Sequence, residues 1–280
     1  AITFSFIAPD QQALFAPGVE AIKIRNPISS ELSEMRSSLL PGLALALAHN
    51  LKRQNGRLRL FETGSRFLMA EPFQEQRMLG LALMGSRASE NWTEQSTRVD
   101  FFDMKGEVEQ LLACSGGSVG FERAEQPGLH DGQTARVMLD GSDVGVLGTI
   151  HPQAAAKLDL PPHTVLAELE LEAVLSGRVP AFEDISRFPE TRRDIAVVVG
   201  RDVPAAALTQ AVAEVAGPDL ADLRLFDVYT GEGVAADKKS VALGLTFRNN
   251  SRTLDDEETS VIVTQVVDYL KEKYEAELRA

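Results

Sequence analysis

The strongest constraint on the fold is the alternation of residues between 240 and 248. Val241, Leu243, Leu245 and Phe247 are apolar, whereas the residues between and beside them are small or polar: Ser240, Ala242, Gly244, Thr246 and Arg248. Because successive side chains of a strand point to opposite faces, the segment predicts a strand with one face on a core. The other face carries little bulk and leaves room for a flat group to lie on the sheet.

The residues before this strand predict a second strand, a helix and a third strand. Residues 195–199 form a short apolar run typical of a covered central strand. A helix is expected to begin at Pro204 and to end at 217–218, where glycine and proline follow each other. Another strand is expected over 223–229.

The residues after this strand predict a helix and a last short strand. Thr253 precedes Asp256 by three residues and predicts a capping box for a helix running to about Lys273. Residues 276–279 can add a strand. The resulting order, βαββα(β), predicts a ferredoxin-like, RNA-recognition-type domain, whose open sheet face commonly receives nucleobases.

Two residues of the strand at 223–229 favour a nucleobase site on the open face. Asp227 and Tyr229 are two residues apart and share a face, which places an acceptor and an aromatic ring beside the small side chains. The ring could stack on a base, an interaction worth about 1–3 kcal/mol. An ordinary sheet tyrosine is the alternative interpretation.

The net charge argues against a general nucleic-acid binder. The formal charge is −13 over 280 residues, and residues 181–280 carry 12 Lys and Arg against 19 Asp and Glu, a charge of −7. Proteins that bind nucleic acid through its backbone carry a basic surface. Any RNA contact must therefore be local, and neither DNA nor a membrane is expected as a partner.

The first part of the chain predicts a separate α+β domain over 1–179, joined by a linker to a second domain over 186–280. The pattern indicates strands at the start, at 21–24, 75–85, 119–123, 134–139, 144–150 and 164–171, and helices at 10–15, 35–54, 101–112 and 152–158. Residues 57–68 are expected to form two strands with a turn at Thr63–Gly64. We expect a chain that begins within a strand to be a fragment of a longer protein.

Few residues offer catalytic or metal chemistry. His49, His130, His151 and His163 lack ligand spacing, and the single cysteine, Cys114, has no recognisable base nearby. One cysteine in 280 residues fits a reducing cytoplasm. The glycines after Tyr229 do not precede a helix, so they favour a hairpin loop over a phosphate loop. We expect no catalytic residue and no metal site.

Four blocks in the second domain resemble one family. FPETRRDIAVVV, LFDVYTGEGV, KKSVALGLTF and SRTLDDEE are similar, in the same order, to the C-terminal anticodon-binding domain of the bacterial phenylalanyl-tRNA synthetase β subunit. NPISSELSEMRSSLLPGL, LRLFETGSRF, DFFDMKGEVE and GTIHPQAAAKLDL resemble the catalytic-like module of the same subunit. One departure is the sequence LHDG at 129–132, where the family commonly has proline after the histidine.

The resemblance implies both a fold and a function. The first domain would have a class II synthetase-like antiparallel sheet with flanking helices, without the ATP and amino-acid chemistry. It would assemble with the catalytic α subunit through the helix at 35–54 and its neighbouring strands, in an α2β2 phenylalanine–tRNA ligase that charges tRNA(Phe) with ATP and Mg²⁺. This chain alone would be inactive, would bind no cofactor, and would lack the editing activity of upstream β domains. Arg59 and Glu62 resemble the ATP-holding strand of active enzymes, but the other ATP-binding arginines are missing.

The resemblance also implies the residues that contact RNA. The anticodon-binding positions would be Ala196, Asp227, Tyr229 and Ser240, with Asp227 facing the guanine at the first anticodon position. Phosphate contacts are expected from positions that carry a cation: Lys239, Arg192, Arg193 and Arg248. Two alternatives stay open, a protein-interaction or RNA-binding module with no synthetase role and a stand-alone α+β enzyme with an accessory ferredoxin-like domain.

Overall fold

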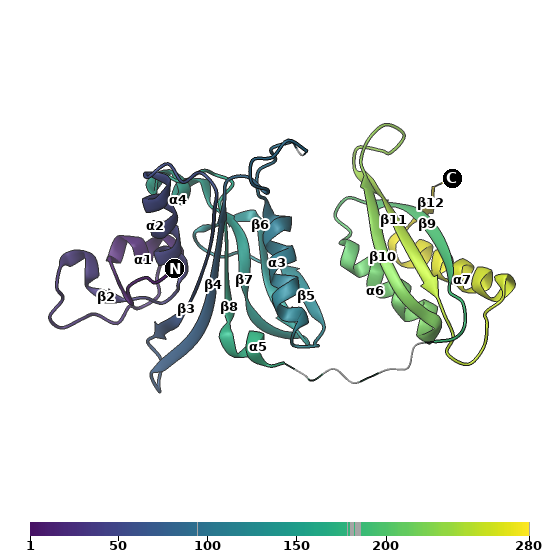
Figure 1. The fold of residues 1–280 in the computed structure, drawn as a ribbon, viewed down its shortest axis with the longest axis horizontal. Helices are drawn as coiled ribbons and strands as arrows, with labels where there is room; N and C mark the ends of the chain where they lie inside the picture. Colours follow the sequence, from purple (N-terminus) through teal and green to yellow (C-terminus); the bar gives the residue numbers. More distant parts are fainter. Residues whose placement is uncertain (94, 178, 180–181, 183–185, 280) are drawn as a thin grey trace. The chain divides into compact units, whose positions relative to one another are not determined.

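The computed structural model describes residues 1–279 except 94, 178, 180–181 and 183–185. The chain divides into two compact units, Ala1–Pro180 and Ala181–Ala280 (Figure 1). Most of residues 177–185, where the chain passes from the first expected domain to the second, lie outside the described residues. In the part that is described, no helix is both long and apolar enough to cross a membrane.

The first unit is built on a six-stranded antiparallel sheet (Figure 1). Its strand order is β3-β4-β8-β7-β6-β5, so β3 and β5 are the edges. A separate pair of short strands, β1 and β2, lies nearer the N-terminus. The strands are β1 (Phe6–Ile7), β2 (Glu34–Met35), β3 (Leu58–Leu68), β4 (Gln74–Met84), β5 (Val119–Arg123), β6 (Leu129–Leu139), β7 (Ser142–Ile150) and β8 (Val165–Glu170).

Helices cover both faces of this sheet. One core joins the first, second and fourth helices to alternate residues of β4 and β8 such as Ala82 and Leu166. The other core joins the third helix to the residues between them, such as Leu83 and Val165. The helices are α1 (Pro9–Phe15), the 3-10 turn η1 (Ser30–Leu32), α2 (Leu40–Leu51), α3 (Phe101–Ala113), α4 (Pro152–Lys157) and α5 (Leu171–Leu175).

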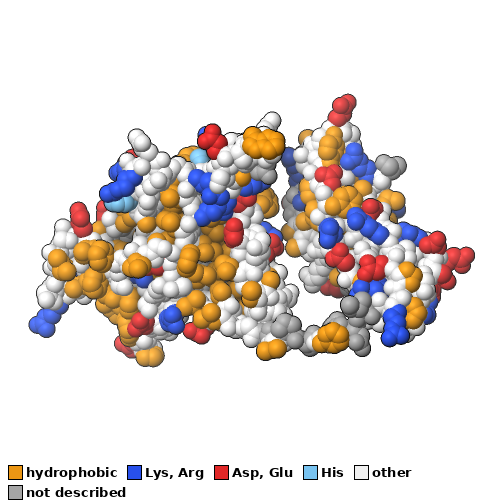
Figure 2. Space-filling view, viewed as in Figure 1, with side chains coloured by type: hydrophobic (Ala, Val, Ile, Leu, Met, Phe, Trp, Pro, Cys, Tyr) orange, Lys and Arg blue, Asp and Glu red, His pale blue; other side chains and the backbone are white. Residues whose placement is uncertain are grey.

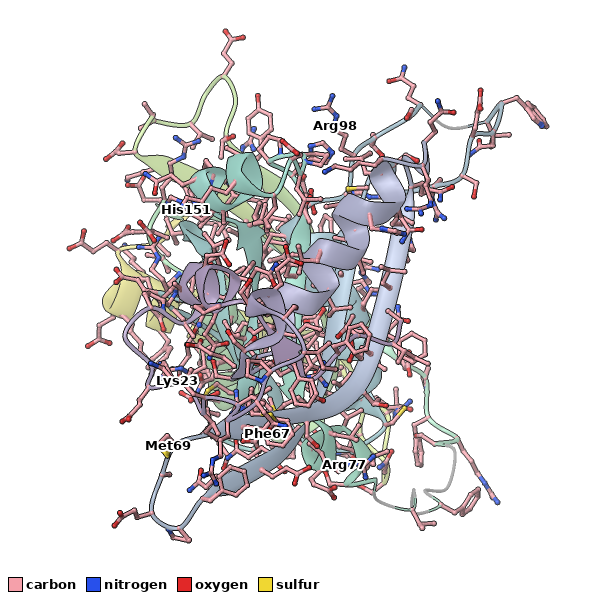
Figure 3. All side chains as sticks on the ribbon, turned by 90° about the vertical axis from the view of Figure 1, so that its left-hand side faces the viewer. Lys23, Phe67, Met69, Arg77, Arg98 and His151 are labelled. Atoms are coloured by element: carbon pink, nitrogen blue, oxygen red, sulfur yellow. The ribbon has the colours of Figure 1, made fainter. Side chains whose placement is uncertain are left out.

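The β3–β4 hairpin differs from the prediction. The predicted turn at Thr63–Gly64 is wrong, because β3 continues unbroken through both residues and pairs with β4 over its whole length. Gly64 is needed for another reason: a Cβ there would collide with the guanidinium of Arg36. The real turn follows Leu68, and Phe67, Met69 and Arg77 gather there, at the end of the unit away from His151 (Figure 3).

The other differences in the first unit concern α2 and its surroundings. The predicted helix at 35–54 begins only at Leu40, because Met35 belongs to β2, and the predicted strand at 21–24 is reduced to an isolated bridge at Lys23. The apolar residues of α2, Leu40, Leu43 and Leu47, are buried in the unit's own core. The helix therefore presents no free apolar stripe to another chain.

Exposed apolar side chains of the first unit lie elsewhere. Ile2, Phe4 and Phe61 are all largely exposed, and the amino group of Ala1 donates to the carbonyl of Phe61, so the N-terminal segment runs beside β3. Figure 2 shows hydrophobic side chains gathered over the part of this unit that contains β1–β3. We call Ile2, Phe4 and Phe61 the N-terminal apolar patch.

The second unit is a four-stranded antiparallel sheet with two helices on one face (Figure 1). The strand order is β10-β11-β9-β12, which makes β9 and β11 central as expected for a ferredoxin-like domain. Val241, Leu243, Leu245 and Phe247 are fully buried beneath the helices. The elements are β9 (Thr191–Gly200), α6 (Ala205–Ala216), the 3-10 turn η2 (Gly217–Asp219), β10 (Leu220–Tyr229), β11 (Lys238–Phe247), α7 (Asp256–Tyr274) and β12 (Glu277–Leu278).

The cap of α7 lies two residues later than predicted. Asp255 accepts a hydrogen bond from the backbone N–H of Glu258, and the Glu258 carboxylate accepts from the backbone N–H of Asp255. The predicted capping box at Thr253 and Asp256 is therefore wrong. A carboxylate at the N-cap serves the same purpose, because it satisfies a free N–H at the positive end of the helix.

Candidate nucleic-acid interface

Helices α6 and α7 pack on one face of the sheet of the second unit, and no helix among the described residues of this unit packs on the other face, which we call the open face. Its residues form rows across the strands, because the register aligns every second position. One row contains Asp227, Ala242 and Ala196, and the next contains Tyr229, Ser240 and Val198. Each row spans three neighbouring strands, a width of about 10 Å.

The four predicted anticodon-binding residues therefore lie in two adjacent rows on one face. Asp227 is exposed, and its carboxylate has no hydrogen bond or ion pair to any described residue. Ala196 and Tyr229 are half-buried, whereas Ser240 is 3% exposed. Ser240 stands directly between Tyr229 and Val198, so its larger neighbours shield a side chain that is on the open face.

The ring of Tyr229 is fixed by its own hairpin loop and by the C-terminus. Its hydroxyl donates to the carbonyl of Glu232 at 3.2 Å, and Gly231 packs so closely that a Cβ there would collide with the ring. The guanidinium carbon of Arg279 lies 4.8 Å from the ring centroid. The glycine after Tyr229 thus belongs to a hairpin loop, in which its missing side chain makes room for the ring.

Arg279 reaches the open face because the last strand pairs with β9. Its backbone N–H donates to the carbonyl of Ala196 at 2.8 Å. Lys238 and Glu277 form an ion pair of 2.6 Å between β11 and the last strand. The Glu277 hydrogen bond and charge raise the pKa of Lys238, and Lys238 in turn lowers the pKa of Glu277. Sequence patterns did not identify Arg279, since its position depends on pairing across 80 residues of chain.

A β-bulge in β10 aims Asp227 and Tyr229 at the open face. Leu225 pairs with Leu243 on the core side, and Asp227 pairs with Ala242 on the open side, so Phe226 is an extra residue. Phe226 is 49% exposed on this edge strand. Without the bulge, Asp227 and Tyr229 would point to the same side as Leu223 and Leu225.

The predicted phosphate contacts lie in different places. Arg192 is on the open face, where its guanidinium bonds Asp194 at 2.8 Å. Arg193 points to the helix side and bonds Asp256 at 2.7 Å, and Arg248 follows β11 and bonds Glu190 at 2.7 Å. Of the four, Arg192 alone belongs to the open-face rows.

Lys239 also lies away from the open face. It pairs with Val199 on the helix side of the sheet, and its ammonium donates to the carbonyls of Arg201 and Val203 at 3.0 and 2.6 Å. Burial lowers the pKa of Lys239, an effect that Asp202 partly offsets. The alternation of the strand already implies that Lys239 lies on the helix side, because neighbouring residues of a strand point to opposite faces and Ser240 is on the open face.

Comparison with known proteins decides the family. The model for the phenylalanyl tRNA synthetase beta chain CLM domain matches residues 1–171, and the ferredoxin-fold anticodon binding domain matches residues 186–279. The chain belongs to the phenylalanyl-tRNA synthetase β-chain family. The resemblance found in the sequence blocks is thereby confirmed, as is the α+β fold with a ferredoxin-like second domain.

Whole-chain relatives carry the same family name. The phenylalanine–tRNA ligase beta subunit of Pseudomonas putida is 47% identical over the full chain, that of Pseudomonas syringae 45%, and that of Vibrio vulnificus 42%. This chain spans 36% of the length of each of these relatives. A pyrrolysyl tRNA synthetase from Desulfitobacterium hafniense is 17% identical, with a TM-score of 0.46 over 62% of this chain and 60% of its own, too distant to support a conclusion.

In this β-chain family member, the residues that resemble an ATP-holding strand have structural partners. Glu62 is buried and forms an ion pair of 2.8 Å with Arg36, and it also accepts from Thr3. Arg59 bonds Glu107 at 3.4 Å and the carbonyl of Arg87 at 2.8 Å. These two side chains do not fit a nucleotide clamp, because their polar groups are used within the unit.

The polar hollow on the sheet of this β-chain unit is lined by paired charges. It has a volume of about 300 Å³. Arg66 lies 3.4 Å from the buried Glu168, and Arg136 lies 3.1 Å from Asp143. Burial raises the pKa of Glu168, although the N–H of Leu39 and the charge of Arg66 act in the opposite direction.

Among the described residues, no group of three or more His, Cys, Asp or Glu is placed to hold a metal ion. His130 lies in an irregularity of β6, where the backbone N–H of Gly132 donates to Nδ1 of His130 and the hydroxyl of Thr134 donates to the His130 carbonyl.

Proposed function

We propose that this chain is the part of a phenylalanine–tRNA ligase β subunit that binds the anticodon of tRNA(Phe) on the open face of its second unit. The observation that carries the proposal is the exposed carboxylate of Asp227, which has no partner among the described residues and lies beside the ring of Tyr229, with only small side chains between them and Ala196. Together they offer an acceptor for a base edge and a surface for a base plane.

The guanine at the first anticodon position is the proposed ligand of Asp227. A carboxylate accepts hydrogen bonds only, and the Watson–Crick edge of guanine offers two adjacent donors, N1 and the 2-amino group. Among the carboxylates of the open face, Asp194 is bonded to Arg192, Glu277 is bonded to Lys238, and Asp222 lies 4.0 Å from Arg224. Asp227 has no partner among the described residues. We assign Ala196 and Ser240 to the floor on which the base lies.

Most of the affinity for tRNA would come from outside this face. The second unit has a formal charge of −7, so it lacks the broad positive potential that drives nonspecific binding. Arg192 and Arg279 are the cations of the open face proposed to approach phosphates, and the proposed interface leaves out Lys239 and Arg193, which lie on the helix side.

The first unit is proposed to assemble with the catalytic α subunit in an α2β2 enzyme that uses ATP and Mg²⁺ in the cytoplasm. The N-terminal apolar patch is the proposed contact, because Ile2, Phe4 and Phe61 are exposed together and single-chain proteins rarely expose such groups without a partner. Phe61→Ser in the complete β subunit should reduce co-purification with α, whereas Phe102→Ser, an exposed residue of α3, should not.

Binding of tRNA(Phe) by the assembled αβ protein tests the anticodon proposal. Tyr229→Ala should weaken binding by the loss of one stacked base, about 1–3 kcal/mol. Val228→Ala is the control, because Val228 is exposed on the same strand but pairs on the core side with Val241. Wild-type affinity for both variants would contradict the proposal and favour a protein-interaction role for the open face.

A further inference from the structure

The bulge that aims Asp227 at the open face also places an aromatic side chain there. Phe226 is the inserted residue, and its ring centroid lies 5.7 Å from the guanidinium carbon of Arg192. Arg192 is on the open face, in the row of Thr246. A half-exposed phenylalanine on an edge strand, beside a cation and with no core around it, contributes little to folding.

The guanidinium of Arg192 lies against the sheet because β11 has a glycine beneath it. A Cβ on Gly244 would lie 2.8 Å from a terminal nitrogen of Arg192. Asp194, directly opposite Gly244, accepts a hydrogen bond from Nε of Arg192 at 2.8 Å. Arg192 is therefore held in place next to Phe226 rather than extended into solvent.

We infer that Phe226 and Arg192 form a second nucleobase subsite on the open face, which takes an unpaired nucleotide of the same RNA strand. The inference rests on the proposed anticodon-binding function. An aromatic ring and a guanidinium plane are the two protein surfaces on which unpaired bases stack. The arrangement parallels that at the other end of the face, where Arg279 lies beside the ring of Tyr229.

The spacing of the two subsites fits separate nucleotides. Ser240 marks the row of Tyr229, and Phe226 is inserted between the partners of Leu243 and Ala242, two to three residues further along β11. That separation is about 7–10 Å, more than the ~3.4 Å between bases stacked on each other. The second base is thus splayed from the first and contacts the protein on its own.

The second subsite should tolerate different bases. Asp194 is engaged by Arg192, and the polar neighbours in the row of Arg192 are Thr246 and Asp222. The carboxylate of Asp222 lies 4.0 Å from the guanidinium of Arg224, so the subsite offers mainly ring and guanidinium surfaces. Every base has a flat face, and stacking is correspondingly insensitive to its identity. Sequence discrimination stays with Asp227, while Phe226 adds affinity for whichever base follows or precedes the guanine.

A binding assay with base-deleted RNA tests the inference. The protein is the assembled αβ enzyme, and the probe is a fluorescent stem-loop with the anticodon loop of tRNA(Phe), in which single loop nucleotides are replaced by abasic ribose. Phe226→Ala should weaken binding of the intact loop by about 5- to 150-fold. Phe226→Tyr should retain binding, and Val228→Ala, equally exposed on the same strand, is the control.

The abasic series locates the subsite. In the wild type, removing the base at one loop position other than the first anticodon guanine should weaken binding, and Phe226→Ala should abolish that penalty while leaving the penalty at the guanine. If Tyr229→Ala weakens binding but Phe226→Ala behaves like Val228→Ala, the second subsite is wrong and the anticodon proposal stands. If Tyr229→Ala and Phe226→Ala both bind as the wild type does, both proposals are wrong.

Discussion

The guanidinium carbon of Arg279, the second-last residue of the chain, lies 4.8 Å from the centre of the Tyr229 ring and so stands over the proposed base-stacking surface. We expect Arg279→Ala to weaken RNA binding several-fold and to reduce the slope of log affinity against log salt by about one, because one cation near the phosphates is lost. Arg279→Lys retains the charge and should retain the slope. Tighter binding by Arg279→Ala would mean that the arginine competes with the base.

The hydroxyl of Tyr229 should be dispensable for RNA binding. It donates to the carbonyl of Glu232 within the same hairpin loop, so the phenol ring, and not its oxygen, is available to a ligand. Tyr229→Phe should bind tRNA(Phe) within about twofold of the wild type and lose ~0.5–1.5 kcal/mol of unfolding free energy. Affinity measured by fluorescence anisotropy and stability measured by urea unfolding separate the two effects. A tenfold loss of affinity would assign the hydroxyl to the RNA.

The buried ion pair in the first unit should be costly to break. The side chains of Arg36 and Glu62 are 3% and 5% exposed, and Nη1 of Arg36 lies 2.8 Å from Oε1 of Glu62. Arg36 also donates to the carbonyl of Ser65 and to the hydroxyl of Thr3. Arg36→Met leaves a buried carboxylate without its partner and should cost about 3–5 kcal/mol of unfolding free energy. Lys52→Met, which breaks an exposed pair with Asp159, should cost less than ~1 kcal/mol. Equal losses in urea unfolding would show that burial does not matter here.

The buried carboxyl of Glu168 should make stability depend on pH. Burial raises its pKa in the folded state, so between the unfolded and folded pKa values the folded chain binds more protons than the unfolded chain. Stability from this group therefore falls as pH rises through that interval. Glu168→Gln keeps an acceptor for the N–H of Leu39 and should remove this part of the pH dependence. Urea unfolding from about pH 4 to pH 8 measures the free energy of unfolding of both proteins. A difference in this free energy between Glu168→Gln and the wild type that is the same at every pH would contradict the assignment.

The second unit could be predicted from sequence because its strongest signals are local. The alternation from Val241 to Phe247 survives unchanged in the structure, with all four apolar residues buried. The sequence of the strand at 223–229 also indicates its bulge. In an unbroken strand Leu223, Leu225, Asp227 and Tyr229 would all lie on the same face, although the first two are apolar and the last two carry polar groups. An inserted residue at Phe226 explains the change, because it turns Asp227 and Tyr229 to the other face.

Glycines misled the sequence interpretation where their role was to admit a distant side chain. Gly64 was expected in a turn, but it lies within β3 because the guanidinium of Arg36 packs against it. Gly244 was expected to leave space for a ligand, and part of that space holds Arg192. Both neighbours come from other elements, so no local pattern contains them.

The contribution of the C-terminus was also out of reach of local patterns. A short strand at 276–279 was predicted, but its pairing with β9 decides that Arg279 stands beside Tyr229 and that Glu277 bonds Lys238. The capping residue of α7 was misplaced for a different reason: Thr253 and Asp255 are both suitable N-caps, each followed three residues later by an acidic residue, and the structure uses the pair Asp255 and Glu258.

The most direct test of the account is the energetic coupling between Asp227 and the first anticodon guanine. Four affinities of the assembled αβ enzyme are needed: wild type and Asp227→Ala, each with the natural loop and with inosine in place of the guanine, which removes the 2-amino donor. We expect inosine to weaken wild-type binding and to have little effect in Asp227→Ala, a coupling of about 0.5–3 kcal/mol. Fully additive losses would contradict it, because the carboxylate and the base would then act independently.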